Sequence, residues 1–492
     1  MSENPTVYRP KRCVFEATLA CNLHCRHCGS SAGRARTDEL TTGEAADLFK
    51  ELFDLGCKRV TISGGEPMLR PDWPDLIRAV SRTGMKAAMI TNGIAFDDEA
   101  ARLARQQGLV HLGFSVDGLD RTHDRIRGRI GHFRMLTRAM ASARQSHIPF
   151  TIITHLNRLN LGEIEMLHDV AKHEGAFSWQ VQPALDMGNM HQHPGLLLRS
   201  RDLPRIEERI GRLIRRNEIR IATANSLGYF GPNEKRLRDH LRLPCFRGCG
   251  AGMRTLGIES NGNVKGCLAL QARHQRCGAD VVEGNVHKER LATIWLRPGA
   301  FAYNREWRID DLGGFCRECR HASLCRGGCR AVMVTSGNGA ENPMCVYRQL
   351  LEERRRNRRA GQAAAVVLAA LLGASSQGCY RSDRIGPGDA QADADSHDYG
   401  DTGTDADSDA DGDSDTDVDT DADADGDSDT DSYDIDYDVD ADSDFDASED
   451  SGPDAALDAD IDATDDASPD AARDASGDAF QDASKDTGPD AD

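Results

Sequence analysis

The stretch CVFEATLACNLHCRHCGS at residues 13–30 joins a strand pattern to three closely spaced cysteines. Residues 13–18 predict a strand, and Cys21, Cys25 and Cys28 follow it in a CxxxCxxC loop. Thiolates are the ligands of iron–sulfur clusters, and a cubane has four irons that each need one external ligand. The three cysteines therefore predict a [4Fe–4S] cluster whose fourth iron can chelate the amino and carboxylate groups of a substrate.

The chain has fifteen cysteines, and metal ligation explains them better than disulfides do. The body is large and its polar start, MSENPTVYRPKR, does not read as a signal peptide, so we do not expect a secreted disulfide scaffold. For the first loop, structural zinc with His24 or His27 as a fourth ligand is the alternative. Apart from Cys379, the cysteines outside the short runs are expected to be packing thiols: Cys13, Cys57 and Cys277.

Short apolar runs alternate with longer helical patterns between residues 13 and 188, which predicts six parallel βα units. The segments CNLHCRHC, GGEP, TNG and SVDG each come directly after a predicted strand. Because the loops after the strands of a parallel barrel converge on a ligand, we expect an α/β fold, a partial (β/α)6 TIM-like barrel with its chemistry on one rim. The predicted strands are 13–18, 59–63, 86–91, 111–116, 149–154 and 178–183.

This arrangement resembles the radical SAM superfamily, in which CxxxCxxC follows the first strand. The resemblance implies that the cluster reductively cleaves S-adenosylmethionine (SAM) to methionine and a 5′-deoxyadenosyl radical, which abstracts a hydrogen atom from an unactivated carbon. Arg127, in HDRIRG, matches a further recurring segment whose role stays open. In the family the GGEP segment contacts the methionine amino group, and polar residues after later strands lie near the ribose and substrate. The residues that match these SAM contacts are Gly64, Gly65, Glu66, Pro67, Asn92, Ser115 and Asp117.

For Asn92, Ser115 and Asp117, ordinary hydrogen-bonded loop residues are the alternative interpretation. A second cysteine-rich region, residues 241–350, resembles the SPASM domain of radical SAM peptide maturases in its cysteine spacing. By that resemblance it holds two fully ligated auxiliary [4Fe–4S] clusters, with a zinc ribbon as the alternative for the CxxC pair. One cluster would be bound by Cys245, Cys249, Cys267 and Cys329, and the other by Cys316, Cys319, Cys325 and Cys345. Cys245 is the least secure ligand, because a substrate atom or Cys277 could replace it.

The resemblance implies an enzyme, a radical SAM/SPASM oxidoreductase or peptide maturase that acts on a ribosomally made peptide or protein. Its electrons would come from a donor such as a flavodoxin or ferredoxin, and no nucleic-acid partner is expected. Leu268 occupies the position where anaerobic sulfatase maturases place an Asp base, which argues against that activity. Two alternatives stay open: a small-molecule enzyme of haem or cofactor maturation, and a tethered surface protein with a degenerate cluster domain. No catalytic acid or base can be identified.

The domain boundaries that follow are 11–190 for the barrel, 191–240 for a helical connector and 241–350 for the SPASM region. Residues 354–379 have the order of a secretion signal, with a basic run, twelve apolar residues and a lipobox-like Cys379. The apolar stretch is shorter than the ~20 residues of a spanning helix. A short amphiphilic helix packed on the enzyme is the competing interpretation. We expect a cytoplasmic protein, with membrane association through this segment as a further hypothesis.

Residues 380–492 form an Asp-rich tail that is predicted to be disordered. From residue 381 onward the chain carries 42 of the 81 acidic and 4 of the 60 basic residues, so the first 380 residues have a net charge of +17. The overall charge of −21 therefore describes neither part. Three hypotheses apply to the tail: a low-complexity spacer, a weak calcium binder that lacks the closing Glu of a calcium loop, and a fused substrate.

Overall fold

The computed structural model describes residues 8–375, apart from 225–226, 239–240, 271–280 and 336–338. One ten-stranded sheet, in the order β10-β9-β8-β1-β2-β3-β4-β5-β6-β7, forms its centre. The six predicted strands are all present in it, and neighbours pair in parallel. Their bounds are β1 (Arg12–Thr18), β2 (Arg59–Gly64), β3 (Lys86–Thr91), β4 (Leu109–Ser115), β5 (Phe150–Leu156) and β6 (Ser178–Pro183).

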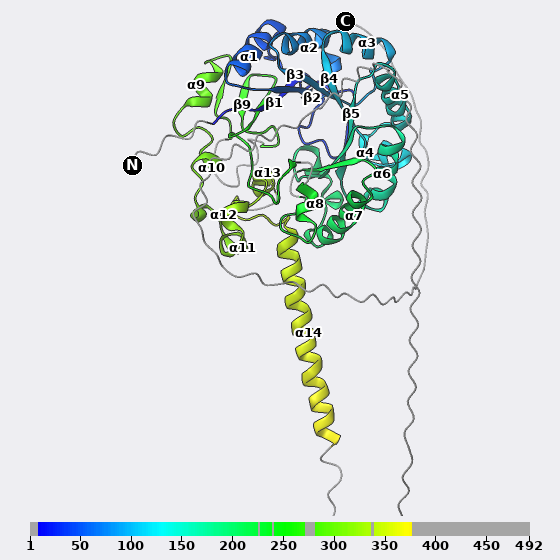
Figure 1. The fold of residues 1–492 in the computed structure, drawn as a ribbon, viewed down its shortest axis with the longest axis vertical. Helices are drawn as coiled ribbons and strands as arrows, with labels where there is room; N and C mark the ends of the chain where they lie inside the picture. Colours follow the sequence, from blue (N-terminus) through cyan, green and yellow to red (C-terminus); the bar gives the residue numbers. More distant parts are fainter. Residues whose placement is uncertain (1–7, 225–226, 239–240, 271–280, 336–338, 376–492) are drawn as a thin grey trace, which may run out of the picture. The chain divides into compact units, whose positions relative to one another are not determined.

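Helices follow the outer side of the curved sheet, as Figure 1 shows for α1, α2, α3, α5, α6 and α7. The first of them, α1, begins after Thr41, because Thr41 and Glu44 form a complete capping box. Phe15, Phe49 and Trp179 are fully buried between sheet and helices, and burying each such side chain stabilises the fold by roughly 1.5–3 kcal/mol. The bounds are α1 (Thr42–Asp54), α2 (Trp73–Arg82), α3 (Asp98–Gln106), α4 (Asp120–Arg127), α5 (His132–Gln145) and α6 (Ile164–His173).

The predicted helical connector contains a strand that the sequence did not reveal. Here β7 (Arg220–Thr223) pairs in parallel with β6, so the sheet continues for one more unit. Its four residues give too short a pattern to be recognised as a strand. The segment is otherwise helical, with α7 (Leu203–Arg216), α8 (Glu234–Arg238), η3 (Gly188–Gln192), η4 (Pro194–Leu196) and η5 (Ser200–Asp202). Two further turns, η1 (Pro67–Leu69) and η2 (Leu161–Glu163), lie within the barrel.

The cysteine-rich region extends the opposite edge of the sheet. Its strand β8 (Thr255–Ile258) pairs in parallel with β1, and Leu256 lies opposite Cys13. The antiparallel β9 (Asn263–Lys265) and β10 (Gly284–Asn285) complete this edge. Short helices follow: α9 (Leu291–Leu296), α10 (Ala302–Arg305), η8 (Ile309–Asp311), α11 (Gly314–Glu318), α12 (Ala322–Cys325) and α13 (Arg330–Thr335).

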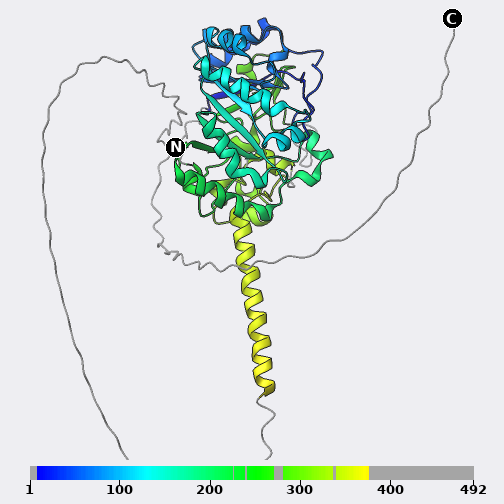
Figure 2. The ribbon, with the colours of Figure 1, turned by 90° about the vertical axis from the view of Figure 1, so that its right-hand side faces the viewer.

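The arginine run and the apolar run belong to one helix, α14 (Val346–Ser375), which is continuous in both views (Figure 1, Figure 2). Near its start Arg348 pairs with Glu341 and Glu352. Residues 353–365 are exposed, so the side chains of this stretch do not pack on the enzyme. Among the described residues, no helix is long and apolar enough to cross a membrane. Cys277, Cys379 and the acidic tail lie outside the described residues.

Candidate functional site

The three cysteines after β1 line one cavity of about 250 Å³ at the carboxyl ends of the strands. All three are free thiols. Burial raises the pKa of Cys25 to about 11, so metal binding there would have to displace a proton. Of the predicted SAM contacts, four line the same cavity: Gly64, Gly65, Asn92 and Ser115.

The GGEP turn passes so close to the cysteine loop that only glycine fits. A Cβ atom on Gly65 would lie 2.1 Å from the carbonyl oxygen of Ala20, far inside van der Waals contact. The backbone N–H of Gly65 donates a 2.8 Å hydrogen bond to the carbonyl of Thr18. Three convergent thiols and a backbone turn without side chains fit a thiolate-bound cluster with a small ligand held against the turn.

Glu66 holds the loops after β2 and β3 together. Its carboxylate is buried and accepts hydrogen bonds from the N–H of Asn92 at 2.7 Å and from the hydroxyl of Thr91 at 2.8 Å. Burial raises the pKa of Glu66. The side-chain amide of Asn92 donates to Asn22 in the cysteine loop at 2.8 Å. Glu66 and Pro67 do not line the cavity among the described residues, so any contact of this turn with SAM would come from the glycine backbone.

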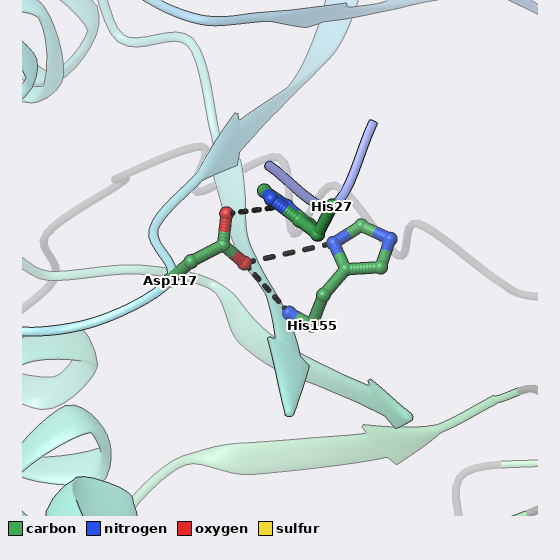
Figure 3. Close-up of side chains that lie close together, drawn as sticks. All are labelled: His27, Asp117 and His155. Atoms are coloured by element: carbon green, nitrogen blue, oxygen red, sulfur yellow. Dashed lines mark hydrogen bonds and ion pairs between the residues drawn. The ribbon is translucent and has the colours of Figure 1, made fainter. Parts of the chain in front are cut away.

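Asp117 is the centre of a buried cluster of polar side chains (Figure 3). Its Oδ2 lies 3.0 Å from Nε2 of His27 and 2.5 Å from Nη2 of Arg127. Its Oδ1 accepts a 2.7 Å hydrogen bond from the N–H of His155 and lies 3.6 Å from that residue's Nδ1. Burial alone would raise the pKa of Asp117, but Arg127 and His27 more than offset it and hold the pKa well below its usual range.

His27, Asp117 and His155 bring three ligand-type side chains within reach of one metal ion. The guanidinium of Arg127 already occupies Oδ2 of Asp117, and burial lowers the pKa of His27, which keeps its ring neutral. A cation at this point would face a carboxylate whose charge is already compensated. We therefore interpret the group as an internal hydrogen-bonded cluster that fixes the rim. The predicted contact of Asp117 with SAM or substrate stays a prediction.

Helix α4 carries Arg127 against the cysteine loop. Its Nη1 lies 3.9 Å from Sγ of Cys25, and the residue is 8% exposed. The helix can end here because Gly128 adopts φ +74°, and a Cβ atom on it would approach the carbonyl of His24 to 2.8 Å. The sequence offered the segment HDRIRG as a signal but gave Arg127 no role.

A directed chain of hydrogen bonds joins the loops after β3 and β4. The N–H of Asp117 donates to Nδ1 of His123 at 3.1 Å, and Nε2 of His123 lies 2.8 Å from Nδ1 of His132. Nε2 of His132 then lies 2.9 Å from the carbonyl oxygen of Asn92. The N–H at one end of the chain and the carbonyl at the other fix the tautomers of both rings. Nδ1 of His123 accepts and Nε2 of His132 donates, so Nε2 carries the proton in each ring. Burial lowers the pKa of both rings, to about 4 for His132, so the chain is neutral.

A larger cavity of about 880 Å³ adjoins the first one and reaches the β8–β9 edge. His155 and Gln182, which lie opposite each other on β5 and β6, approach to 2.6 Å between their Nε2 atoms. Neither residue was predicted from the sequence, because a single polar residue in a strand is not a distinctive signal. Polar side chains on its wall include Ser31, Ser63, His155, Gln180, Gln182 and Asn263.

The charges on the wall of this cavity are paired with one another. Glu16 binds Arg36, and Oε1 of Glu259 lies 2.5 Å from Nζ of Lys265. Glu16 also accepts 3.1 Å hydrogen bonds from the N–H and hydroxyl of Ser260. The wall is therefore rich in hydrogen-bonding groups but electrically balanced, which suits a polar ligand of low net charge.

Cys13 and Cys57 are buried in the main core, as expected of packing thiols, and the described cysteines of residues 241–350 gather in two groups. Burial raises the pKa of Cys267 to about 11 and of Cys329 to about 12, and the nearby Cys249 thiol adds to both shifts. Phe246, next to Cys245, packs on Tyr229, whose hydroxyl accepts a 3.0 Å hydrogen bond from the N–H of Cys329. The second group consists of Cys316, Cys319, Cys325 and Cys345. Burial and the proximity of the other thiols raise the pKa values of Cys325 and Cys345.

Comparison with known families agrees with both regions. Residues 15–171 match the model of the radical SAM superfamily, and residues 249–320 match the SPASM model, an iron–sulfur cluster-binding domain. An AdoMet-dependent heme synthase of Methanosarcina barkeri is 28% identical over 69% of this chain and 97% of its own length. The mycofactocin maturase MftC of Mycobacterium tuberculosis is 27% identical over 67% and 81%. The fold also resembles Streptococcus suis SuiB bound to S-adenosylmethionine, with a TM-score of 0.55, 17% identity and coverage of 68% and 76%.

Proposed function

The chain is a radical SAM enzyme with a SPASM domain, and from that premise we propose that it modifies a peptide or protein by hydrogen-atom abstraction. The observation that carries the proposal is the cavity of about 880 Å³ beside the cysteine loop. Its wall presents amide, hydroxyl and imidazole groups, and its charges are paired with each other. Such a wall can hydrogen-bond a peptide backbone without demanding a charged substrate.

In this proposal Cys21, Cys25 and Cys28 hold the cluster, and the backbone at Gly64 and Gly65 carries SAM. The cluster and SAM, when bound, supply the 5′-deoxyadenosyl radical that abstracts the hydrogen atom. The protein's own residues position these groups. Glu66 fixes the turn that faces SAM, and the buried polar cluster around Asp117 fixes the next loop of the rim.

The SPASM region would bind two further [4Fe–4S] clusters through the two groups of cysteines. Because four thiolates saturate a cluster, these would not bind SAM, and their work would be to pass electrons to or from the substrate. The electron donor would be a flavodoxin or ferredoxin. The apolar residue at the position of the sulfatase-maturase base, Leu268, lies on the cavity wall, which speaks against that chemistry.

Relatives also support a peptide substrate. MftC is a maturase by name, another relative is a PqqA peptide cyclase, and SuiB has been crystallised with its precursor peptide SuiA. The Asp-rich tail of this chain is one candidate peptide, and short peptides encoded beside the gene are the others.

Mass spectrometry tests the proposal. The full chain, reconstituted with iron and sulfide without oxygen, would be incubated with SAM, a reductant and each candidate peptide. We expect 5′-deoxyadenosine together with a changed peptide mass. In the absence of added peptide, a changed mass of residues 380–492 would identify the tail as substrate. The incubation would be repeated in D2O, because epimerisation changes no mass in H2O, and SAM cleavage with no mass change in any peptide in either solvent would argue against peptide modification.

A small-molecule substrate of the haem type is the second candidate. The match to the heme synthase of M. barkeri covers 97% of the length of that synthase, and this favours the haem-type candidate. The same reconstituted enzyme would be incubated with an iron porphyrin precursor of haem and the products separated by chromatography. Porphyrin conversion would establish this candidate, and an unchanged porphyrin beside a modified peptide would exclude it.

A further inference from the structure

Arg127 lies between a predicted cluster ligand and a buried carboxylate. Through Nη1 it is 3.9 Å from Sγ of Cys25, and through Nη2 it is 2.5 Å from Oδ2 of Asp117. Arg127 and Asp117 are almost completely removed from solvent, at 8% and 0% exposure respectively. Of the described residues that line the cavity around the three thiols, Arg127 is the only lysine or arginine.

The anion of this pair is held firmly in place. Besides Arg127, the carboxylate of Asp117 contacts His27 and accepts a hydrogen bond from the N–H of His155. The cation is held as firmly, because Arg127 is the last residue of α4 and the last turn of this helix packs on the cysteine loop, where the N–H of Arg26 donates to the carbonyl of Ile126 at 2.9 Å. The two charges therefore keep a fixed order, with the guanidinium nearer the thiol.

We propose that the Asp117–Arg127 pair sets the reduction potential of the cluster bound by Cys21, Cys25 and Cys28. This inference rests on the proposed function, since it assumes that the three thiolates hold the cluster. Reduction adds one negative charge to the cluster, which a nearby cation favours and a nearby anion opposes. Net charge and hydrogen bonds to the sulfur ligands are among the main determinants of iron–sulfur potentials.

The position of each charge gives the sign of its effect. Arg127 stabilises the reduced cluster and raises its reduction potential. Asp117 lowers the reduction potential, and it lies further from the cluster, behind the guanidinium of Arg127. In a buried site such charges act with little solvent screening, at distances where single-charge effects exceed a factor of ten in an equilibrium. Removing the cation and removing the anion must therefore shift the potential in opposite directions.

The test is a potentiometric titration of the reconstituted full chain, followed by electron paramagnetic resonance. The component whose spectrum changes when SAM is added at the end identifies the first cluster among the three. The variants are Arg127→Gln, Arg127→Lys and Asp117→Asn, with Arg125→Gln as matched control. Arg125 lies on the same helix and loses the same charge, but it is exposed.

For Arg127→Gln we expect the ratio of reduced to oxidised cluster at a fixed potential to fall at least about tenfold, which is 59 mV for one electron. Asp117→Asn should shift the potential the other way, and Arg127→Lys and Arg125→Gln should stay close to the wild type. A structural role alone would not reverse the sign between the first two variants. Shifts in the same direction, or none beyond that of Arg125→Gln, would overturn the inference.

If Arg127→Gln does not fold, Asp117→Asn and Arg127→Lys still decide, because a positive shift for the first with none for the second is expected only from charge. A wild type that shows no SAM-sensitive signal would instead contradict the proposed function. Loss of the charge effect and loss of the cluster are thus separate outcomes.

Discussion

His123 and His132 are joined by a hydrogen bond, with 2.8 Å between Nε2 of His123 and Nδ1 of His132. Their rings are stacked with 4.8 Å between centroids, and both are completely buried. The pair begins at the N–H of Asp117 and ends at the carbonyl of Asn92. Two successive loops of the rim, after β3 and β4, are therefore held at a fixed separation by two neutral imidazoles.

Replacing His132 should weaken SAM binding in a way that depends on the substitute. In His132→Leu the carbonyl of Asn92 loses its partner, which costs about 1–3 kcal/mol for a buried group, and we expect about tenfold weaker binding. His132→Gln places an amide donor near the position of Nε2 and should stay within about threefold of the wild type. Equilibrium binding of radiolabelled SAM to the reconstituted protein measures both, and equal affinities for the two variants would disprove this role of the pair.

Gly65→Ala should abolish SAM binding. The added Cβ atom would meet the backbone of Ala20, which cannot move without displacing the cysteine loop. Gly43→Ala is the matched control, because nothing lies within 4 Å of a Cβ atom there, in the first turn of α1. We expect the control to bind SAM normally and to be slightly more stable, since alanine favours the helix by about 0.5–1 kcal/mol. Normal binding by Gly65→Ala would show that the turn can shift.

Glu207→Gln should stabilise the protein increasingly as the pH rises from 4.5 to 7, with the full gain above pH 7. Burial raises the pKa of Glu207 to about 7, whereas the ordinary value is 4.5. Below pH 4.5 the carboxyl is protonated in both the folded and unfolded states. Between 4.5 and 7 the folded state binds the proton more tightly, so the stability of the wild type falls as pH rises and levels off above 7. The gain from Gln should reach at most about 3 kcal/mol above pH 7.

Anaerobic thermal melts at pH 5 and pH 8 would test this expectation. The difference in melting temperature between Glu207→Gln and the wild type should be larger at pH 8. The N–H of Asn233 donates to Oε1 of Glu207 at 2.8 Å, and an amide oxygen can still accept that hydrogen bond. A difference that is the same at both pH values would mean that Glu207 does not titrate in this range.

Serine substitutions should separate the clusters. Cys28→Ser should lower the iron content by about four atoms per chain and remove the SAM-sensitive signal. Cys325→Ser should also lower the iron content, and it should lower the melting temperature more. The segment around Cys325 has a small apolar core of Leu312, Cys316, Ala322 and Met333, so in the proposed function metal ligation would supply much of its stability. Cys57→Ser, a buried thiol of the main core, should leave the iron content unchanged.

The barrel was predictable because its signals are local and repeated. Each parallel strand is a short apolar run, and each rim segment, such as GGEP with Gly65, follows directly on a strand. The start of α1 is also a local signal, because Thr41 and Glu44 have the spacing of a capping box. The sequence patterns therefore predicted the six strands and the face that carries the chemistry.

The contacts that complete the rim were not predictable in this way. Arg127 and His155 owe their roles to partners that lie tens of residues away in the sequence, Cys25 and Asp117, and a single polar residue such as His123 has no periodicity. The same holds for the parallel pairing of β8 with β1, because no pattern in either strand specifies its partner. Pairing partners of this kind follow from tertiary structure alone.

The pairing of β8 with β1 has a consequence for anyone who wishes to transplant the auxiliary region. Main-chain hydrogen bonds join the two regions there, so the cysteine-rich region is not an independent domain on a linker. Removing this region would expose the unpaired edge of β1, and exposed strand edges promote self-association. A chimera that exchanges this region between two enzymes should therefore keep the native strand Thr255–Ile258 with the barrel and join the foreign sequence after it.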